Sequence, residues 1–127
     1  MSVPAELHYA ESHEWLRLDA DGTATVGITD HAQAALGDLV YIELPTVGRI
    51  VESGEACAIV ESVKAASDVN APIAGEILAV NEDVARTPET VNEGAYAAWL
   101  FKMKPADANP ASGLLDAAGY QKMIGEA

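Results

Sequence analysis

The sequence predicts a small, mainly β domain of the sandwich or barrel type, followed by a helical tail. Short apolar segments recur along the chain and are separated by Pro, Gly, Asn or Asp, which is typical of strands joined by tight turns. An Asp-Gly pair between two of the first segments indicates a hairpin. A pattern of strand, turn and strand also occurs twice in the middle of the chain, which favours a fold built from two similar halves.

Each early element has its own local signal. Residues 15–18 and 24–28 are expected to pair as a hairpin across the turn that contains Gly22. A short helix is expected between Thr29 and Gly37, because it has a threonine cap, a possible capping pair and a glycine stop. Apolar runs then predict four further strands, at residues 39–44, 56–60, 75–80 and 97–103.

The repeated pattern spans residues 42–51 and 69–78. Three pairs match between the two copies: Pro45 with Pro72, Gly48 with Gly75, and Ile50 with Ile77. Each copy is expected to form a strand, a proline-started turn that needs the backbone freedom of glycine, and a second strand. Such turns recur in any β protein, but the matching apolar positions favour a duplication with pseudo-twofold symmetry. The same register places Lys64 opposite Gly37, and both are expected to lie in turns.

The last quarter of the chain changes in character. Thr87 and Pro88 are the N-cap and first-turn proline of a short helix. Residues 105–112 are rich in Ala, Pro and Asn and indicate a linker, and Asp116 is placed to cap a helix, although Gly119 lowers its helix propensity. We therefore expect a domain at residues 1–104 and, at residues 105–127, a linker and helical appendage packed on the same domain.

The composition excludes several classes of partner. Twenty acidic and seven basic residues give a formal charge of −13, which repels nucleic acid and anionic membranes. That charge either serves solubility alone or steers the chain to partners with basic docking surfaces. The chain has no apolar run of the roughly 20 residues that cross a bilayer, and its start lacks a secretory or transit signal. A cytoplasmic monomer is expected, or a mitochondrial matrix protein if the chain is processed in a eukaryote.

The side chains offer little for catalysis. Cys57 is the only cysteine, and its place in an apolar strand predicts a buried, inert thiol. The three histidines lack the spacing of metal ligands, so no metal site is expected. The sequence contains neither a glycine-rich phosphate loop nor a nucleophile elbow. We therefore expect a protein that is not an enzyme.

Lys64 is the one unusual cation. It is the only lysine before Lys102, and it stands between Val63 and Ala65 at the expected tip of a hairpin. An exposed lysine is ordinarily only a surface charge. A sole lysine at a hairpin tip with small neighbours is, in addition, a candidate for acylation, which attaches an arm whose chemistry ordinary side chains lack.

Five ordered segments around this lysine carry a family resemblance. They read SHEW at residues 12–15, VGITDHAQ at 26–33, LGDLVYIELP at 36–45, VESVKA at 60–65 and SDVNAPIAGE at 67–76. Together they resemble the glycine cleavage system H protein family, and the similarity extends to the Leu114-Leu-Asp tail. The resemblance implies a hybrid barrel-sandwich of the lipoyl and biotinyl type, with short helices and a C-terminal helical tail.

The resemblance also implies a function and a site. Lipoate is expected in amide linkage to Lys64, although recombinant material can be apo. The attachment-loop residues are Glu61, Ser62, Val63, Ala65 and Asp68. The protein is expected to be a non-catalytic carrier of the aminomethyl group of glycine. The implied partners are a pyridoxal-phosphate glycine decarboxylase, a tetrahydrofolate-dependent aminomethyltransferase, dihydrolipoamide dehydrogenase and the lipoylating enzymes.

The family further implies a cleft that shelters the loaded arm. The matching residues are Ser12, His13, Glu14, Asp30 and His31, of which Glu14 is a candidate partner for the amine of the adduct. Capping of turns is an equally good role for Ser12 and Asp30. One segment departs from the family pattern: residues 92–99 have Ala95 where the family has proline, and the link to Trp99 is shorter. This loop is expected to lie away from the lysine motif.

Several alternatives remain open from the sequence. A biotin carrier usually has methionine on both sides of its lysine, whereas Val63 and Ala65 stand here. The lipoyl domains of 2-oxo acid dehydrogenases prefer Asp-Lys-Ala and are generally fused to a catalytic core. An H-like protein that relays lipoate to other enzymes would have the same motifs. From a different class, the chain could be an unmodified β-sandwich that only binds a partner.

Overall fold

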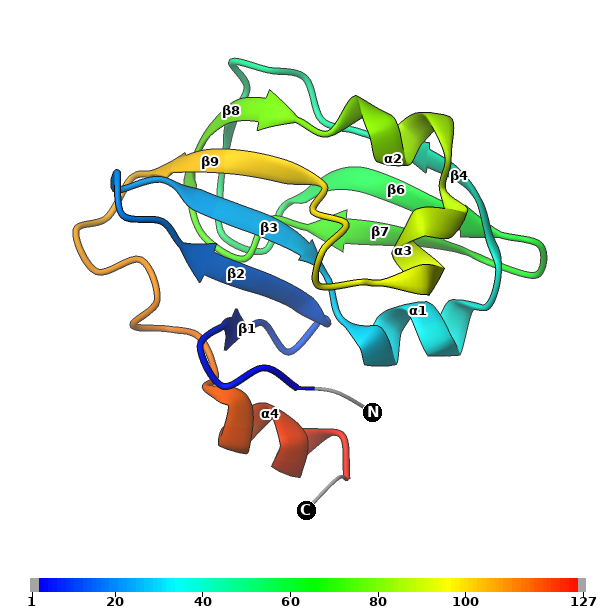
Figure 1. Ribbon diagram of the computed structural model, residues 1–127. Helices are drawn as coiled ribbons and strands as arrows, with labels where there is room; N and C mark the ends of the chain where they lie inside the picture. Colours follow the sequence, from blue (N-terminus) through cyan, green and yellow to red (C-terminus); the bar gives the residue numbers. More distant parts are fainter. Residues whose placement is uncertain (1–2, 126–127) are drawn as a thin grey trace.

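The computed structural model describes residues 3–125 and contains two antiparallel sheets with four short helices around them (Figure 1). The six-stranded sheet has the order β1-β2-β3-β9-β8-β5, and the three-stranded sheet has the order β4-β6-β7. The mainly β fold class is therefore confirmed. In chain order the elements are β1 (His8–Tyr9), β2 (Glu14–Leu18), β3 (Ala24–Ile28), α1 (Asp30–Leu36), β4 (Leu39–Glu43), β5 (Ile50–Val51), β6 (Ala56–Ser62), β7 (Ala66–Asn70), β8 (Gly75–Val80), α2 (Glu82–Arg86), α3 (Glu89–Glu93), β9 (Phe101–Pro105) and α4 (Ala117–Met123).

Two apolar clusters hold these layers together. The larger cluster contains inward-facing residues of both sheets, including Leu16, Val60 and Ile77, and helices α2 and α3 each add one buried valine to it. The smaller cluster lies beneath the tail, where Tyr9 stacks on Tyr120 with ring centroids 4.7 Å apart. Helix α4 therefore packs against β1, below the main sheet in Figure 1.

The local signals of the first hairpin and helix are confirmed. Strands β2 and β3 pair in register from Glu14 opposite Ile28 to Leu18 opposite Ala24. The hydroxyl of Thr29 accepts the Ala32 amide at 3.1 Å and caps α1. These contacts lie within a few residues in sequence, so the local chain specifies them.

The structure differs from the predicted elements at several places. The strand expected at residues 97–103 begins only at Phe101, because the carbonyl of Gly94 accepts the amides of Ala97 and Ala98 and turns the chain there. Pro105, expected to open the linker, is the last residue of β9 and pairs with Gly75. Helix α2 was not expected, since a helix of five residues has too little periodicity to detect.

The two repeat copies share the order of strand, turn and strand, but not the environment of the matched residues. Gly48 has a φ of 92°, which favours glycine, whereas at Gly75 an added Cβ would lie 2.3 Å from the Lys104 carbonyl oxygen. Gly75 is therefore needed for a close approach of β9 and not for a left-handed turn. Likewise Ile50 is 68% exposed and Ile77 is fully buried, so the matched isoleucines face opposite sides.

Candidate functional site

Lys64 lies at the tip of the hairpin that joins β6 to β7, as the sequence predicted. The two strands pair up to Glu61 and Ala66, and the Ser62 amide then donates to the Ala65 carbonyl at 2.7 Å to close the turn. Val63, Lys64 and Ala65 are all exposed. In Figure 1 this hairpin extends past α1 and α3 to the edge of the molecule. A second protein can therefore reach the lysine amine.

The hydroxyl of Ser62 organises the tip from inside. It accepts the backbone amides of Ala65 at 3.0 Å and Lys64 at 3.3 Å, and it lies 3.2 Å from the Ala65 carbonyl oxygen, to which it donates. Ser62 is itself buried, at 8% exposure. The tip thus combines an exposed lysine with a turn whose amides are paired, which limits the conformations of the lysine backbone.

A neighbouring segment supports the tip from outside. The Val63 amide donates to the carbonyl of Asp38 at 3.2 Å. The stem of Lys64 passes over Gly37, where an added Cβ would lie 3.4 Å from the lysine Cε. Lys64 and Gly37, which the repeat aligns as equivalent positions of its two copies, are therefore also in contact, which the alignment did not predict.

Contrary to expectation, the first residue of the 92–99 segment, Asn92 of α3, lies close to the lysine motif. The side-chain amide of Asn92 donates to the Gly37 carbonyl at 2.9 Å and accepts the Leu39 amide at 2.9 Å. These two residues flank Asp38, whose carbonyl holds Val63. The expectation was wrong because this proximity arises from packing of α3 on α1 and β4, which are distant from α3 in sequence.

Glu14, one of the predicted cleft residues, joins the two sheets, and the neighbouring cleft residue Ser12 bonds to its carboxylate. Glu14 is 1% exposed; one of its carboxylate oxygens accepts the Ser12 hydroxyl, and the other accepts the Asn70 amide of β7 at 3.0 Å. Burial raises the pKa of the Glu14 carboxyl, and the bonds from Ser12 and Asn70 oppose that rise. Sequence reasoning missed Asn70, whose contribution is a backbone amide that any residue would supply.

His13 and His31 form a second group with the tail. Their rings lie 4.7 Å apart, and His13 Nδ1 lies 2.7 Å from the hydroxyl of Tyr120 on α4. Burial lowers the pKa of His13, and the adjacent His31 lowers it further, so the neutral imidazole is favoured. His13 also has a φ of 76°, a left-handed conformation that is uncommon for a side-chain-bearing residue. The sequence placed Tyr120 on an apolar helix face but did not predict its contact with His13.

Asp30 lies at the start of α1. Its carboxylate accepts the Gln33 side-chain amide at 2.8 Å, and its own backbone amide donates to the Tyr96 hydroxyl at 3.2 Å. The two members of the expected capping pair are therefore in contact, but the side chain that caps the helix is that of Thr29. Asp68, by contrast, is exposed on β7 between the lysine tip and Glu14.

Strand β7 connects the lysine tip to the Glu14 group. Ala66 follows the tip, and Asn70 is bonded to Glu14. The four residue steps between them span about 13 Å at the usual rise of a strand. The lysine tip and the Glu14 carboxylate thus lie at opposite ends of one strand.

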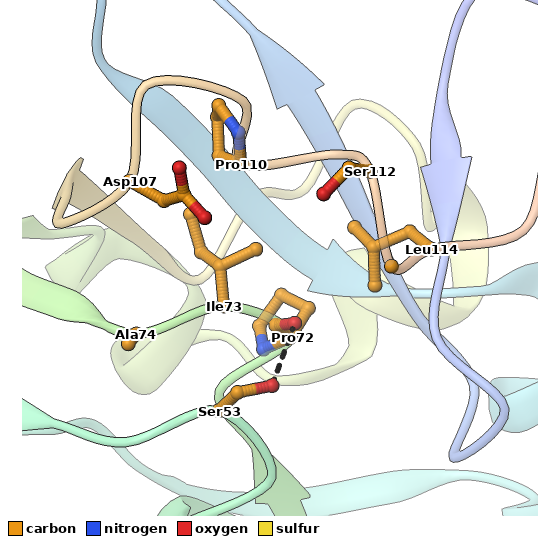
Figure 2. Close-up of a pocket in the computed structure, with 9 residues that line it drawn as sticks. Ser53, Pro72, Ile73, Ala74, Asp107, Pro110, Ser112 and Leu114 are labelled. Carbon is orange, nitrogen blue, oxygen red and sulfur yellow. Dashed lines mark hydrogen bonds between the residues drawn. The ribbon is translucent and has the colours of Figure 1, made fainter.

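A hollow elsewhere on the molecule contains none of the predicted site residues. It has a volume of about 280 Å³ and lies between the turn at Pro72 and the tail. Figure 2 shows Asp107, Pro110 and Ser112 on the tail side and Ser53 below, where its hydroxyl donates to the Pro72 carbonyl at 3.4 Å. Its lining has no nucleophile paired with a base, so it does not suggest a catalytic centre.

The remaining chemistry of the described residues is sparse. Cys57 is buried, and burial raises the pKa of its thiol to about 11. Within residues 3–125, no three His, Cys, Asp or Glu side chains gather in a way that could hold a metal ion. The helices in the same range are too short and too polar to span a bilayer.

Comparison with known proteins places these features in context. The family described as glycine cleavage H-protein matches residues 7–127. The glycine cleavage system H protein of Azoarcus sp. (strain BH72) is 63% identical over 98% of each chain, and that of Nitrosomonas europaea is 64% identical over 98% of this chain and 96% of its own. The crystal structure of a glycine cleavage system H protein from Mycobacterium marinum superposes with a TM-score of 0.89 at 39% identity, over 97% of this chain and 99% of that one.

Proposed function

Because the chain belongs to the glycine cleavage H-protein family, we propose that it is the lipoyl-bearing carrier of the glycine cleavage system. In this role it shuttles the aminomethyl group of glycine from the decarboxylase to the aminomethyltransferase. The observation that carries the proposal is Lys64, an exposed amine on a hairpin tip with paired backbone amides, within a chain that matches the family from residue 7 onward. A carrier needs one reachable attachment point on a rigid support.

Lys64 fits lipoate as an amide-linked group. Its amine is exposed, its neighbours Val63 and Ala65 are small enough to admit an acylating active site, and Gly37 leaves space beside its stem. When attached, the dithiolane supplies the sulfur chemistry that accepts the aminomethyl group. The chain itself presents the arm, and Glu61, Ser62 and Asp68 shape the strands and turn around it. Recombinant protein is expected to contain an apo fraction.

The partners follow from this cycle. Lipoylating enzymes load Lys64, a pyridoxal-phosphate glycine decarboxylase and a tetrahydrofolate-dependent aminomethyltransferase act on the arm, and dihydrolipoamide dehydrogenase reoxidises it. The bond-making groups belong to these enzymes, and the chain works as a non-catalytic subunit. Its formal charge of −13 supports fast docking to basic surfaces. A tethered arm raises the local concentration of the carried group at each active site. The bacterial relatives support action in the cytoplasm.

The cleft residues have a second role in this proposal. Glu14 anchors the amine of the loaded arm, which takes the place of the Ser12 hydroxyl on the carboxylate. Three further cleft residues are assigned to the same site: Asp30, His13 and His31. Because the neutral form of His13 is favoured, its ring does not repel a positively charged adduct. We also propose that the tail after residue 104 folds as one unit with the preceding domain, which is supported by the two backbone hydrogen bonds of 2.8 Å that Leu115 exchanges with Tyr9.

Intact-mass and peptide analysis of protein from a lipoate-competent host tests the attachment. Wild type and Lys104→Arg, a control at another exposed lysine, are expected to carry one lipoyl group on Lys64. Lys64→Arg is expected to fold normally, carry none and fail in glycine-dependent exchange with the purified decarboxylase. Absence of acylation on wild type, when a related H protein is modified in parallel, contradicts the proposal. A lipoylated chain without glycine-dependent exchange favours the lipoate relay instead.

A further inference from the structure

A single side chain, Asn92 of α3, holds the segment that supports the lysine tip. We call residues 37–39 the supporting link. The Asn92 amide nitrogen donates to the Gly37 carbonyl at 2.9 Å, and its oxygen accepts the Leu39 amide at 2.9 Å. The same nitrogen donates to Gln33 Oε1 at 2.9 Å. Both ends of the supporting link are therefore tied to one rigid group.

The supporting link contacts the lysine hairpin at two points. The carbonyl of its middle residue, Asp38, accepts the Val63 amide at 3.2 Å. Its first residue, Gly37, lies under the Lys64 stem, where an added Cβ would be 3.4 Å from Cε and 4.0 Å from Nζ. Its last residue, Leu39, is buried and pairs with Ser62. A shift of the supporting link would therefore move Lys64, because the link contacts Ser62 and Val63 next to the lysine and also contacts the lysine stem.

The supporting link needs an external restraint. Gly37 has φ 89° and ψ −159°, a conformation essentially confined to glycine, and glycine is the residue with the greatest backbone freedom. The strand pairing between β4 and β6 is also irregular between Leu39 and Tyr41. The regular backbone hydrogen bonds of the sheet are therefore interrupted next to the supporting link. Two of the Asn92 hydrogen bonds restrain the supporting link at Gly37 and Leu39, in addition to the local bond from the Gly37 amide to the Gln33 carbonyl at 2.9 Å.

We propose that Asn92 is a positioning residue for the acylation of Lys64. By holding the supporting link, it keeps the Val63 amide paired and the lysine stem against Gly37, so that the tip presents Nζ in one geometry. The proposal rests on the proposed function, in which Lys64 receives a lipoyl group. In that reaction the neutral amine attacks the carbonyl of an activated acyl adenylate, the new C–N amide bond forms, the acyl C–O bond breaks, adenosine monophosphate leaves, and the proton lost from the attacking nitrogen passes to solvent.

Loss of Asn92 is predicted to raise the KM of acylation and to leave kcat nearly unchanged. Without Asn92 the tip samples several conformations, and the acylating enzyme binds only the competent fraction, so the apparent affinity falls in proportion to that fraction. Asn92→Ala is expected to raise KM for the apo chain about fivefold, the factor that corresponds to one net hydrogen bond of about 1 kcal/mol, with kcat unchanged within about twofold. Asn92→Asp keeps an acceptor for the Leu39 amide but turns a carboxylate oxygen toward the Gly37 carbonyl and Gln33 Oε1, so its KM is expected to rise at least as much.

The experiment uses purified apo full-length chain, a lipoate-protein ligase, lipoate and ATP, with acylation followed by intact mass. Asn81→Ala is the matched control, because Asn81 is also half-buried and donates its amide to a backbone carbonyl, that of Trp99 at 2.8 Å, away from the lysine tip. Its KM is expected to match wild type. Amide hydrogen exchange provides a readout without enzyme: the Val63 and Leu39 amides are expected to exchange faster in Asn92→Ala and at the wild-type rate in Asn81→Ala.

The outcomes separate the two proposals. If wild type is not acylated, the proposed function is wrong, and the role of Asn92 in acylation is wrong with it. If wild type is acylated and both Asn92 variants retain its KM, only the positioning role is wrong. An equal rise of KM in Asn92→Ala and Asn81→Ala also contradicts it, because general loosening of the fold then explains the effect. Should Asn92→Ala fail to fold, the Asn92→Asp variant supplies the measurement.

Discussion

Ser62→Ala tests whether a buried hydroxyl orders the lysine tip. The change removes the acceptor of the Ala65 and Lys64 amides, at 3.0 and 3.3 Å, and the donor to the Ala65 carbonyl. Because Lys64 and Ala65 are exposed, water replaces the lost partners. The free energy of unfolding should therefore fall by only about 1 kcal/mol, the net value of one hydrogen bond.

The tip itself should respond more strongly than the whole fold. Thermal unfolding should shift down by about 4 °C for a domain of this size, while hydrogen exchange at the Lys64 and Ala65 amides should accelerate well beyond that of buried strand amides. Ser62→Thr keeps the hydroxyl and serves as the control. Unchanged exchange at both amides in Ser62→Ala would refute the reasoning, since the turn would then be held by its backbone alone.

Three further predictions concern the core and its buried ionisable groups. Gly27→Ala places a Cβ 2.6 Å from the buried ring of Trp15, so overpacking should lower the free energy of unfolding by about 3 kcal/mol, seen as a lower denaturant midpoint at unchanged slope; a wild-type midpoint would show that the ring moves freely. Burial raises the pKa of Glu14, so its contribution to stability is present below the normal carboxyl range and is lost as the pH rises through the raised value. The stability of Glu14→Gln relative to wild type should accordingly increase as the pH rises above the ordinary carboxyl range, and a flat difference would contradict the raised pKa. Cys57, whose thiol pKa is raised to about 11, should react with a thiol reagent near pH 8 only when denaturant unfolds the chain, and rapid labelling of the native protein would exclude the buried position.

Local sequence signals determined the elements that carry the site. The Asp-Gly turn, the Thr29 cap and the Asp116 cap were each predicted from residues a few positions apart, and the structure confirms them. Lys64 was placed on a hairpin tip for the same reason: a short polar run between two apolar segments has few other ways to connect paired strands. The prediction of secondary structure was wrong where the local propensity was ambiguous. At residues 97–100 a strand was expected, but β9 begins only at Phe101.

Only the tertiary structure decided what surrounds those elements. Asn92 reaches the supporting link, Glu14 accepts the Asn70 amide, and Tyr120 meets His13 across segments remote in sequence. Two of these contacts involve a backbone amide, which every residue except proline offers, so the residue type at that position has no signal for the pairing. Hydrophobic periodicity indicates which face of an element is buried, but it does not indicate which polar group of the neighbouring element will form a hydrogen bond with it. That choice is made when the two sheets and the tail pack together.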